Sequence, residues 1–167
     1  RKNYRSAFIN GVRYFNSPYN EYGHLTGATS LSEFTYFLAQ LPAEYLYKNI
    51  GRKLDILILG AGSMYSVKRV SPYSRETTIV EIDPVIIESS KLFCDDFNRL
   101  DELRNYEIII DDAKHFLKNT TMRYDLIIMD ISAPYYLGTA LMHNVDTYKI
   151  VRSRLKEGGI FSESTQA

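Results

Sequence analysis

The sequence predicts an α/β fold built on a parallel sheet, and three observations predict it. Short runs rich in Ile and Val recur along the chain from Leu54 onward. Nearly every position in these runs is apolar, as in strands that are covered on both faces. Segments with helical character separate the runs, and this alternation is typical of parallel α/β sheets.

The first part of the chain has a different pattern. Two β-like runs, Tyr4–Ile9 and Val12–Phe15, flank Asn10-Gly11. Because Asn-Gly favours the two-residue turn with positive φ, we expect a small N-terminal β-hairpin region over residues 1–28. Residues 29–167 are then expected to form one α/β domain.

A helix is expected at the start of this domain. Apolar residues recur there at the spacing of one helical face, at Phe34, Phe37, Leu38 and Leu41. Pro42 could end or kink this helix, and Ala43–Asn49 could continue it. The expected strands are Leu54–Leu59, Thr77–Ile82, Glu107–Ile110, Asp125–Met129 and Gly159–Ser162. The expected helices between them are Ser63–Val70, Pro84–Phe93, Ala113–Lys118 and Val145–Lys156.

The composition excludes several classes of protein. With 20 Lys plus Arg against 20 Asp plus Glu the net charge is zero, so neither nucleic acid nor an anionic membrane is an expected partner. The single cysteine, Cys94, excludes an internal disulfide, and no spacing of the three histidines suggests a metal site. No signal peptide or membrane-spanning run is present, which favours a cytoplasmic protein. Because the chain starts at Arg1, we expect a piece of a longer chain that is truncated at one or both ends. The longer chain could include membrane segments.

The ends of the first two expected strands are candidate ligand sites, since ligands of open α/β sheets lie beyond the carboxyl ends of the strands. The first strand ends in Gly60-Ala61-Gly62-Ser63, a turn of small residues that lets a ligand approach the backbone. Such a turn can also serve packing alone. Glu81 ends the second strand, 21 residues after Gly60, a spacing at which an acid reaches the ribose hydroxyls of a bound nucleotide.

Further acids follow the expected strands. Asp83 precedes Pro84 and is expected mainly to cap the next helix. Asp112 could accept a hydrogen bond from the exocyclic amine of an adenine or could equally cap a helix. Asp130 follows the fourth strand and could hold or deprotonate a cationic amine.

Several of these segments together resemble the spermidine synthase family, the polyamine aminopropyltransferases. The matching motifs are LDILILGAG at 54–62, VEIDP at 80–84, DDAKHFL at 111–117, YDLIIMD at 124–130 and LKEGGIF at 155–161. The resemblance implies a Rossmann-like sheet of the class I methyltransferase type and a chain that often dimerises. It also implies transfer of an aminopropyl group from decarboxylated S-adenosylmethionine to a small-molecule amine, without a metal.

The resemblance also implies roles for individual residues. Gly60, Gly62 and Ser63 would lie beside the nucleoside and its tail, and Glu81 beside the ribose. Asp112 and Ala113 would contact the adenine. Asp130 would be the remaining acid at the reaction. Independently of the resemblance, Tyr36, Tyr135, Tyr136 and Tyr148 could line the acceptor pocket, since aromatic rings attract cations. With 14 tyrosines in the chain, packing in the core or at the surface is the better explanation for any single one.

Two departures from the family pattern weaken the site, one beside the tail of the donor and one beside the acceptor. Ser63 stands where the family's glycine loop has an acid that holds the aminopropyl amine, and Ala133 stands where a second acid activates the acceptor. An alkylamine resembles lysine, with a pKa of about 10.4, and must lose a proton to attack. General-base help is worth about 10²–10⁴-fold, so the loss at Ala133 predicts poor synthesis of ordinary spermidine.

Three functions remain open from the sequence. The first is a spermidine-synthase-like transferase with an altered acceptor. The second is a class I methyltransferase that uses S-adenosylmethionine itself, which the loss of the acid at Ser63 favours. The third is a domain that has kept the fold for binding or assembly without catalysis, for which Met64 and Ala133 are the best support.

Overall fold

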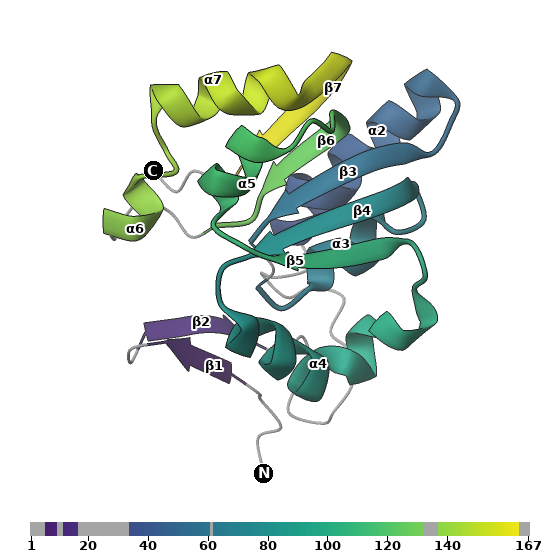
Figure 1. The fold of residues 1–167 in the computed structure, drawn as a ribbon. Coiled ribbons are helices and arrows are strands. Elements are labelled where there is room, and N and C mark those ends of the chain that lie inside the picture. Colours follow the sequence, from purple (N-terminus) through teal and green to yellow (C-terminus); the bar gives the residue numbers. More distant parts are fainter. Residues whose placement is uncertain (1–5, 10–11, 17–33, 61, 132–136, 164–167) are drawn as a thin grey trace.

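The computed structural model describes residues 6–9, 12–16, 34–60, 62–131 and 137–163. Five of the described strands form one sheet in the order β5-β4-β3-β6-β7, with every neighbouring pair parallel (Figure 1). These strands are β3 (Leu54–Leu59), β4 (Ser74–Glu81), β5 (Tyr106–Ile110), β6 (Tyr124–Met129) and β7 (Leu155–Glu163). The predicted α/β fold with a parallel sheet is confirmed.

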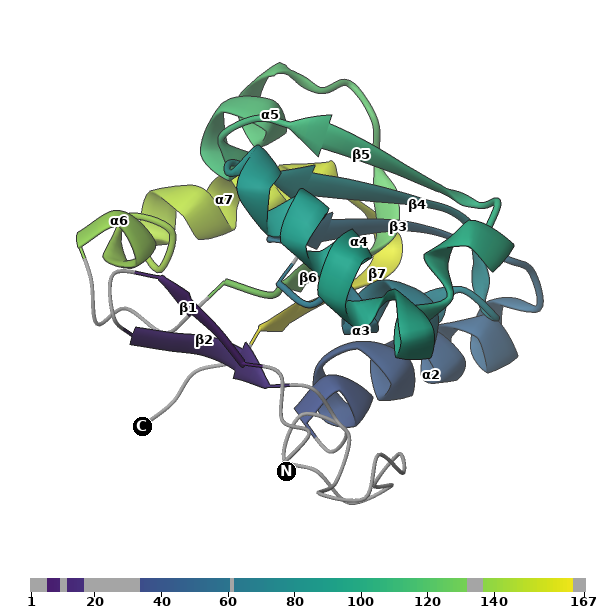
Figure 2. The same cartoon turned by 90° about the horizontal axis from the view of Figure 1, so that it is seen from below.

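Helices cover both faces of the sheet (Figures 1 and 2). One face carries α2 (Leu41–Ile50), α3 (Tyr65–Val70) and α4 (Pro84–Asn98), and the other carries α5 (Ala113–Asn119) and α7 (Val145–Arg154). Each face has its own apolar cluster, with Ile56, Ile58 and Ile128 on the first and Leu57, Leu59 and Met129 on the second. This alternation along the strands explains why the runs are apolar at nearly every position.

The order of the strands creates a topological switch point. The chain passes from the central strand β3 to β4 and β5 on one side, and then returns to place β6 and β7 on the other. In open sheets of this kind, ligands bind where the order reverses, beyond the carboxyl ends of the strands. Here that point lies between β3 and β6, after Leu59 and Met129.

The expected helix at the start of the domain is present, but after the α-helical residues Phe34 and Thr35 it contains a π-helix. The segment η1 (Tyr36–Gln40) passes directly into α2, with the Leu41 N–H donating to the Tyr36 carbonyl. Pro42 therefore neither ends nor interrupts the helical run. It lies in the first turn of α2, where a missing backbone N–H costs little.

Several predicted boundaries are wrong. The helix predicted to run to Lys156 ends at Arg154, and Leu155 and Lys156 belong to β7. The Lys156 ammonium forms ion pairs with Asp55 and Asp125, which stabilise the extended conformation of Leu155 and Lys156. The helix after Glu81 continues to Asn98, followed by the short 3₁₀ turn η2 (Leu100–Glu102), and the short helix α6 (Leu137–Ala140) was not predicted.

The expected hairpin is also present. Strands β1 (Ser6–Ile9) and β2 (Val12–Asn16) pair antiparallel and belong to a separate two-stranded sheet. The Asn10-Gly11 turn and the expected domain limit after residue 28 lie outside the described residues, so both stay predictions. Within the described ranges, no helix combines the length and apolarity needed to cross a membrane.

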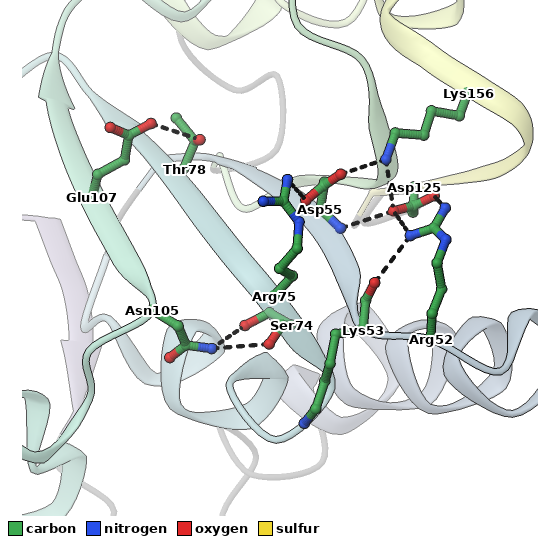
Figure 3. A network of polar contacts seen from close by, with 10 residues as sticks. All are labelled: Arg52, Lys53, Asp55, Ser74, Arg75, Thr78, Asn105, Glu107, Asp125 and Lys156. Carbon is green, nitrogen blue, oxygen red and sulfur yellow. Dashed lines mark hydrogen bonds and ion pairs between the residues drawn. The ribbon is translucent and has the colours of Figure 1, made fainter.

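Cations neutralise a buried carboxylate, Asp125, and a partly buried one, Asp55, at the amino ends of the strands (Figure 3). Asp125 on β6 is 2% exposed at its side chain and accepts two hydrogen bonds from Arg52, at 2.7 and 3.0 Å. Lys156 lies 3.0 Å from the same carboxylate and also contacts Asp55, which pairs with Arg75. Burial opposes the charge on Asp125, but Arg52, the Asp55 N–H and Lys156 together hold its pKa at about 2. This edge of the sheet is a structural ion-pair network.

Candidate functional site

Three candidate residues lie side by side at the carboxyl edge of the sheet. Leu59 is the register partner of both Val80 and Met129. The next residue after each of these three is Gly60, Glu81 or Asp130. These residues therefore lie at the same level at the carboxyl ends of three neighbouring strands. The acids of β4 and β6 thus flank the glycine of β3 at the switch point.

Gly60 is required at this position for two reasons. Its φ is +88°, which side-chain-bearing residues rarely adopt. A Cβ there would also lie 2.7 Å from the Asp130 carbonyl oxygen. The backbones meet because the Gly60 N–H donates to Val80 and the Asp130 N–H donates to Leu59, both at 2.8 Å. Packing alone accounts for this glycine, although a ligand would benefit from the same absence of a side chain.

The turn after Gly60 is held from behind by helix α4. The Ser90 hydroxyl donates to the Gly62 carbonyl and the Asn98 amide donates to the Ser63 carbonyl, both at 2.5 Å. Ser90 and Asn98 are fully buried, and Ser63 is 7% exposed. Because their carbonyls are bound from the α4 side, the orientation of the Gly62 and Ser63 peptides is set. Sequence reasoning missed both α4 residues, since single polar residues in a helix carry no signal of burial.

Glu81 is buried at the tip of β4, where it is 6% exposed. Its Oε1 accepts a hydrogen bond of 3.0 Å from the Asp83 N–H. The Asp83 carboxylate in turn accepts from the Val85 N–H at 2.9 Å, at the start of α4. The capping role expected for Asp83 is thus observed. A carboxylate such as Glu81, with two oxygens, can accept from both hydroxyls of a diol.

Asp130 is partly buried at the end of β6, and its Oδ2 accepts a hydrogen bond of 2.6 Å from the Ser66 hydroxyl. The pKa of Asp130 is raised to about 6, chiefly by burial; the Ser66 hydrogen bond opposes the rise and the nearby charge of Glu81 adds to it. Within the part of the chain that the structure describes, this carboxylate makes no ion pair. A raised pKa and a perturbing charge partner are characteristic of functional sites.

The tip of β5 is organised around helix α5. Asp112 caps this helix, because its Oδ1 accepts from the His115 N–H at 2.8 Å. Asp111 lies 2.9 Å from the His115 ring through each of its oxygens. The capping alternative for Asp112 is therefore observed, while adenine binding by Asp112 and Ala113 stays a prediction. The two functions are compatible, since one oxygen suffices for the cap.

The predicted acceptor residues are only partly described. Tyr36 lies on η1, is 37% exposed, and meets the Phe37 ring edge-on at a centroid distance of 5.2 Å. The end of β7 adjoins this segment, because the Ser162 hydroxyl donates to the Leu38 carbonyl at 2.7 Å. Tyr135, Tyr136 and the departure at Ala133 lie outside the described residues. A pocket formed by these tyrosines stays a prediction.

A second group of titratable side chains lies at the tip of β7. The Tyr148 hydroxyl donates to Glu163 Oε1 at 3.1 Å, and His143 Nδ1 lies 3.7 Å from Glu163 Oε2. The pKa of Tyr148 is raised by burial and by the neighbouring Glu163 carboxylate. The structure buries the His143 side chain, which is 6% exposed. Among the described residues, no group of three or more His, Cys, Asp or Glu side chains is arranged to hold a metal ion.

The sequence of this chain is similar to those of known aminopropyltransferases. The model of the spermine/spermidine synthase domain matches residues 37–167, which is most of the chain. The chain belongs to the spermine/spermidine synthase family. Polyamine aminopropyltransferase 2 of Aquifex aeolicus is 31% identical over 156 residues, covering 88% of this chain and 30% of that protein. A polyamine aminopropyltransferase of Yersinia pestis is 32% identical over 115 residues, covering 66% and 38%.

This spermine/spermidine synthase domain thus spans about a third of the length of these curated relatives, between 30% and 38%. Its fold is similar to that of spermidine synthase in complex with the transition-state analogue AdoDATO, with a TM-score of 0.68 and 23% identity over 78% of this chain and 44% of that one. Human methyltransferase-like protein 13 in complex with SAH gives a TM-score of 0.58 and 18% identity, covering 73% and 60%. These likenesses confirm the Rossmann-like fold of the methyltransferase type.

Proposed function

We propose that this domain binds decarboxylated S-adenosylmethionine at the carboxyl edge of its sheet and takes part in aminopropyl transfer to a small-molecule amine. In this proposal the turn from Gly60 to Ser63 adjoins the nucleoside, Glu81 accepts the ribose hydroxyls, and Asp112 and Ala113 adjoin the adenine. Asp130 holds the reacting amine. The family membership and the arrangement of these strand tips support it.

One observation carries the proposal: the two acids Glu81 and Asp130 flank Gly60 at the switch point. The charge of Glu81 acts on Asp130, so the two carboxylates are close enough to repel each other. A cationic ligand relieves this repulsion, whereas an anionic group adds to it. A sulfonium nucleoside with an ammonium tail and a diol therefore complements the edge in both charge and hydrogen bonding.

The transfer places one demand on the protein. A neutral amine nitrogen attacks the carbon next to the sulfonium, a C–N bond forms, and the C–S bond breaks with its electrons going to sulfur, which leaves methylthioadenosine. The nitrogen must lose a proton, and the Asp130 carboxylate is ionised above its pKa of about 6 and can accept it. Because Ala133 stands where the family has a second acid, Asp130 would have to remove this proton without a second carboxylate.

A class I methyltransferase is the second candidate, because Ser63 leaves the turn without the acid that disfavours a carboxylated donor. The carboxylate of S-adenosylmethionine would, however, enter an edge that already holds two acids. We therefore expect the decarboxylated donor to bind more tightly. A domain without catalysis would bind neither donor.

Calorimetry with decarboxylated S-adenosylmethionine, S-adenosylmethionine and methylthioadenosine tests the proposal on the chain as it stands. We expect the decarboxylated donor to bind at least about tenfold more tightly than the carboxylated one, a difference of about 1.4 kcal/mol. A preference for S-adenosylmethionine would support the methyltransferase, and no binding of any of the three would refute both enzymes.

A variant at the ribose acid sharpens this test. Glu81→Gln should weaken all three nucleosides by about tenfold, since it replaces a charged acceptor by a neutral one. Glu107→Gln is the matched control, because Glu107 lies on neighbouring β5 and accepts a hydrogen bond from Thr78, away from the carboxyl edge (Figure 3). Equal affinities for both variants would show that the ribose lies elsewhere.

A further inference from the structure

The hydrogen bond from Ser66 to Asp130 joins residues that are 64 positions apart in the sequence. Ser66 lies in the first turn of α3 and is 1% exposed, and its hydroxyl meets Asp130 Oδ2 at 2.6 Å. A serine hydroxyl in a helix commonly faces solvent or bonds to the carbonyl four residues back. This one instead leaves its helix for a carboxylate at the tip of β6.

We propose that Ser66 is a positioning residue for Asp130, whose hydroxyl fixes the carboxylate and favours its ionised form for binding an amine. The inference rests on the proposed function, because it assigns Asp130 a cationic partner. Ser66 itself is not proposed to touch a substrate. It acts through the orientation and charge of Asp130.

The geometry leaves one oxygen of Asp130 available for that partner. Ser66 engages Oδ2, and among the described residues Oδ1 accepts no hydrogen bond. A carboxylate held through one oxygen cannot rotate freely, so the other keeps a defined direction. The backbone next to it is equally fixed, since the Asp130 N–H is bound to Leu59 and its carbonyl lies against Gly60.

The electrostatics give the hydroxyl a second effect. Two influences disfavour the charge of Asp130, namely burial and the neighbouring Glu81, and Ser66 is the group that opposes them. A hydrogen bond donated to a carboxylate stabilises its ionised form. Without the hydroxyl, Asp130 would stay protonated to a higher pH, and a protonated carboxyl cannot accept a proton from an amine.

The local fold explains why Ser66 can reach this position. Met64 adopts a left-handed conformation, with a φ of 59°, and its side chain is fully buried in the core. This turn starts α3 directly after the Gly60–Ser63 segment, so the first turn of the helix faces the tip of β6. Sequence analysis placed Ser66 inside an expected helix, where a hydroxyl looks ordinary.

The experiment follows the ¹³C-carboxyl resonance of Asp130 by NMR as the pH is raised, in the unaltered chain and in Ser66→Ala, with Asp130→Asn to assign the signal. We expect the Asp130 pKa to rise from about 6 to about 7 or above in Ser66→Ala. Ser66→Thr, which keeps the hydroxyl, should restore the original pKa. An unchanged or lower Asp130 pKa in Ser66→Ala would overturn the inference.

Ser74→Ala is the matched control, because Ser74 is also buried but lies at the amino end of β4. It should leave the Asp130 pKa unchanged; a rise as large as that in Ser66→Ala would overturn the specific role. Where the chain transfers aminopropyl groups, the acid limb of kcat/KM should follow the same shift, with about tenfold lower activity at pH 5.5 and less than about twofold change at pH 9. The titration decides the inference, whereas donor calorimetry separately decides the proposed function.

Discussion

Replacing Asp130 by Asn should stabilise the domain above pH 6. The pKa of this carboxyl is raised from 3.8 to about 6, chiefly by burial, so the folded state resists its ionisation. The difference corresponds to about 3 kcal/mol, at about 1.4 kcal/mol per pH unit. The sign follows from the direction: stability from this group is fully present below pH 3.8 and is lost as the pH rises through about 6.

Urea denaturation at pH 4 and pH 8 measures this effect. Asn keeps an oxygen for the Ser66 hydroxyl but carries no charge, so Asp130→Asn should be more stable than the unaltered chain by about 2–3 kcal/mol at pH 8 and within about 1 kcal/mol of it at pH 4. Groups common to both chains cancel in the comparison. Asp146→Asn, on an aspartate whose side chain is 83% exposed, should show no such dependence on pH.

Two results would contradict this prediction: an equal difference in stability between the two chains at pH 4 and pH 8, or a loss of stability in Asp130→Asn at pH 8. The first result would mean that the carboxyl is as well solvated in the fold as in the unfolded chain. The second would mean that its charge stabilises the fold through an attraction stronger than the burial and the Glu81 repulsion. Either result would also weaken the case for a functional acid at this strand tip.

Three further variants test the edges of the sheet. Gly60→Ala should cost at least about 2 kcal/mol in thermal unfolding, because its Cβ would lie 2.7 Å from the Asp130 carbonyl oxygen; Gly51→Ala, also at positive φ but with open space, should cost less. Asp125→Asn should remove about 2 kcal/mol of stability that is present above pH 3.8 and lost as the pH falls through about 2, so its acid-unfolding curve should flatten. Asn98→Ala should weaken donor binding several-fold in calorimetry by releasing the Ser63 carbonyl, and unchanged affinity would mean that the turn is rigid without it.

Much of the sheet could be predicted from the sequence because buried parallel strands leave a strong local pattern. Leu54–Leu59 is observed as predicted, and the motifs that follow it carried the family resemblance. Boundaries were less reliable where distant residues decide them, as at Leu155, whose strand is favoured by the ion pairs of Lys156.

The candidate site was predictable in outline and not in its supporting contacts. Acids at strand tips can be found by position, so Glu81 and Asp130 were identified from the end of each apolar run. Their neighbours come from helices that are remote in sequence, and nothing local marks Ser66 or Asn98 as buried. Asp112 shows a different limit of sequence analysis, because its local pattern fitted a helix cap and an adenine contact equally well.

The π-helical turn at Tyr36–Gln40 contains an extra residue, so a deletion there would change the rotation of the preceding residues about the helix axis. Each residue of a helix advances the chain by about 100° around the axis, and a π-turn contains more residues than an α-turn. Leu38 and Ala39 of this turn are buried in the core, whereas Phe37 is 66% exposed. Deleting Phe37 should therefore convert the turn to an ordinary one and rotate Phe34 and Thr35 by roughly 100° about the helix axis, while Leu38 and the helix after it keep their packing on the sheet.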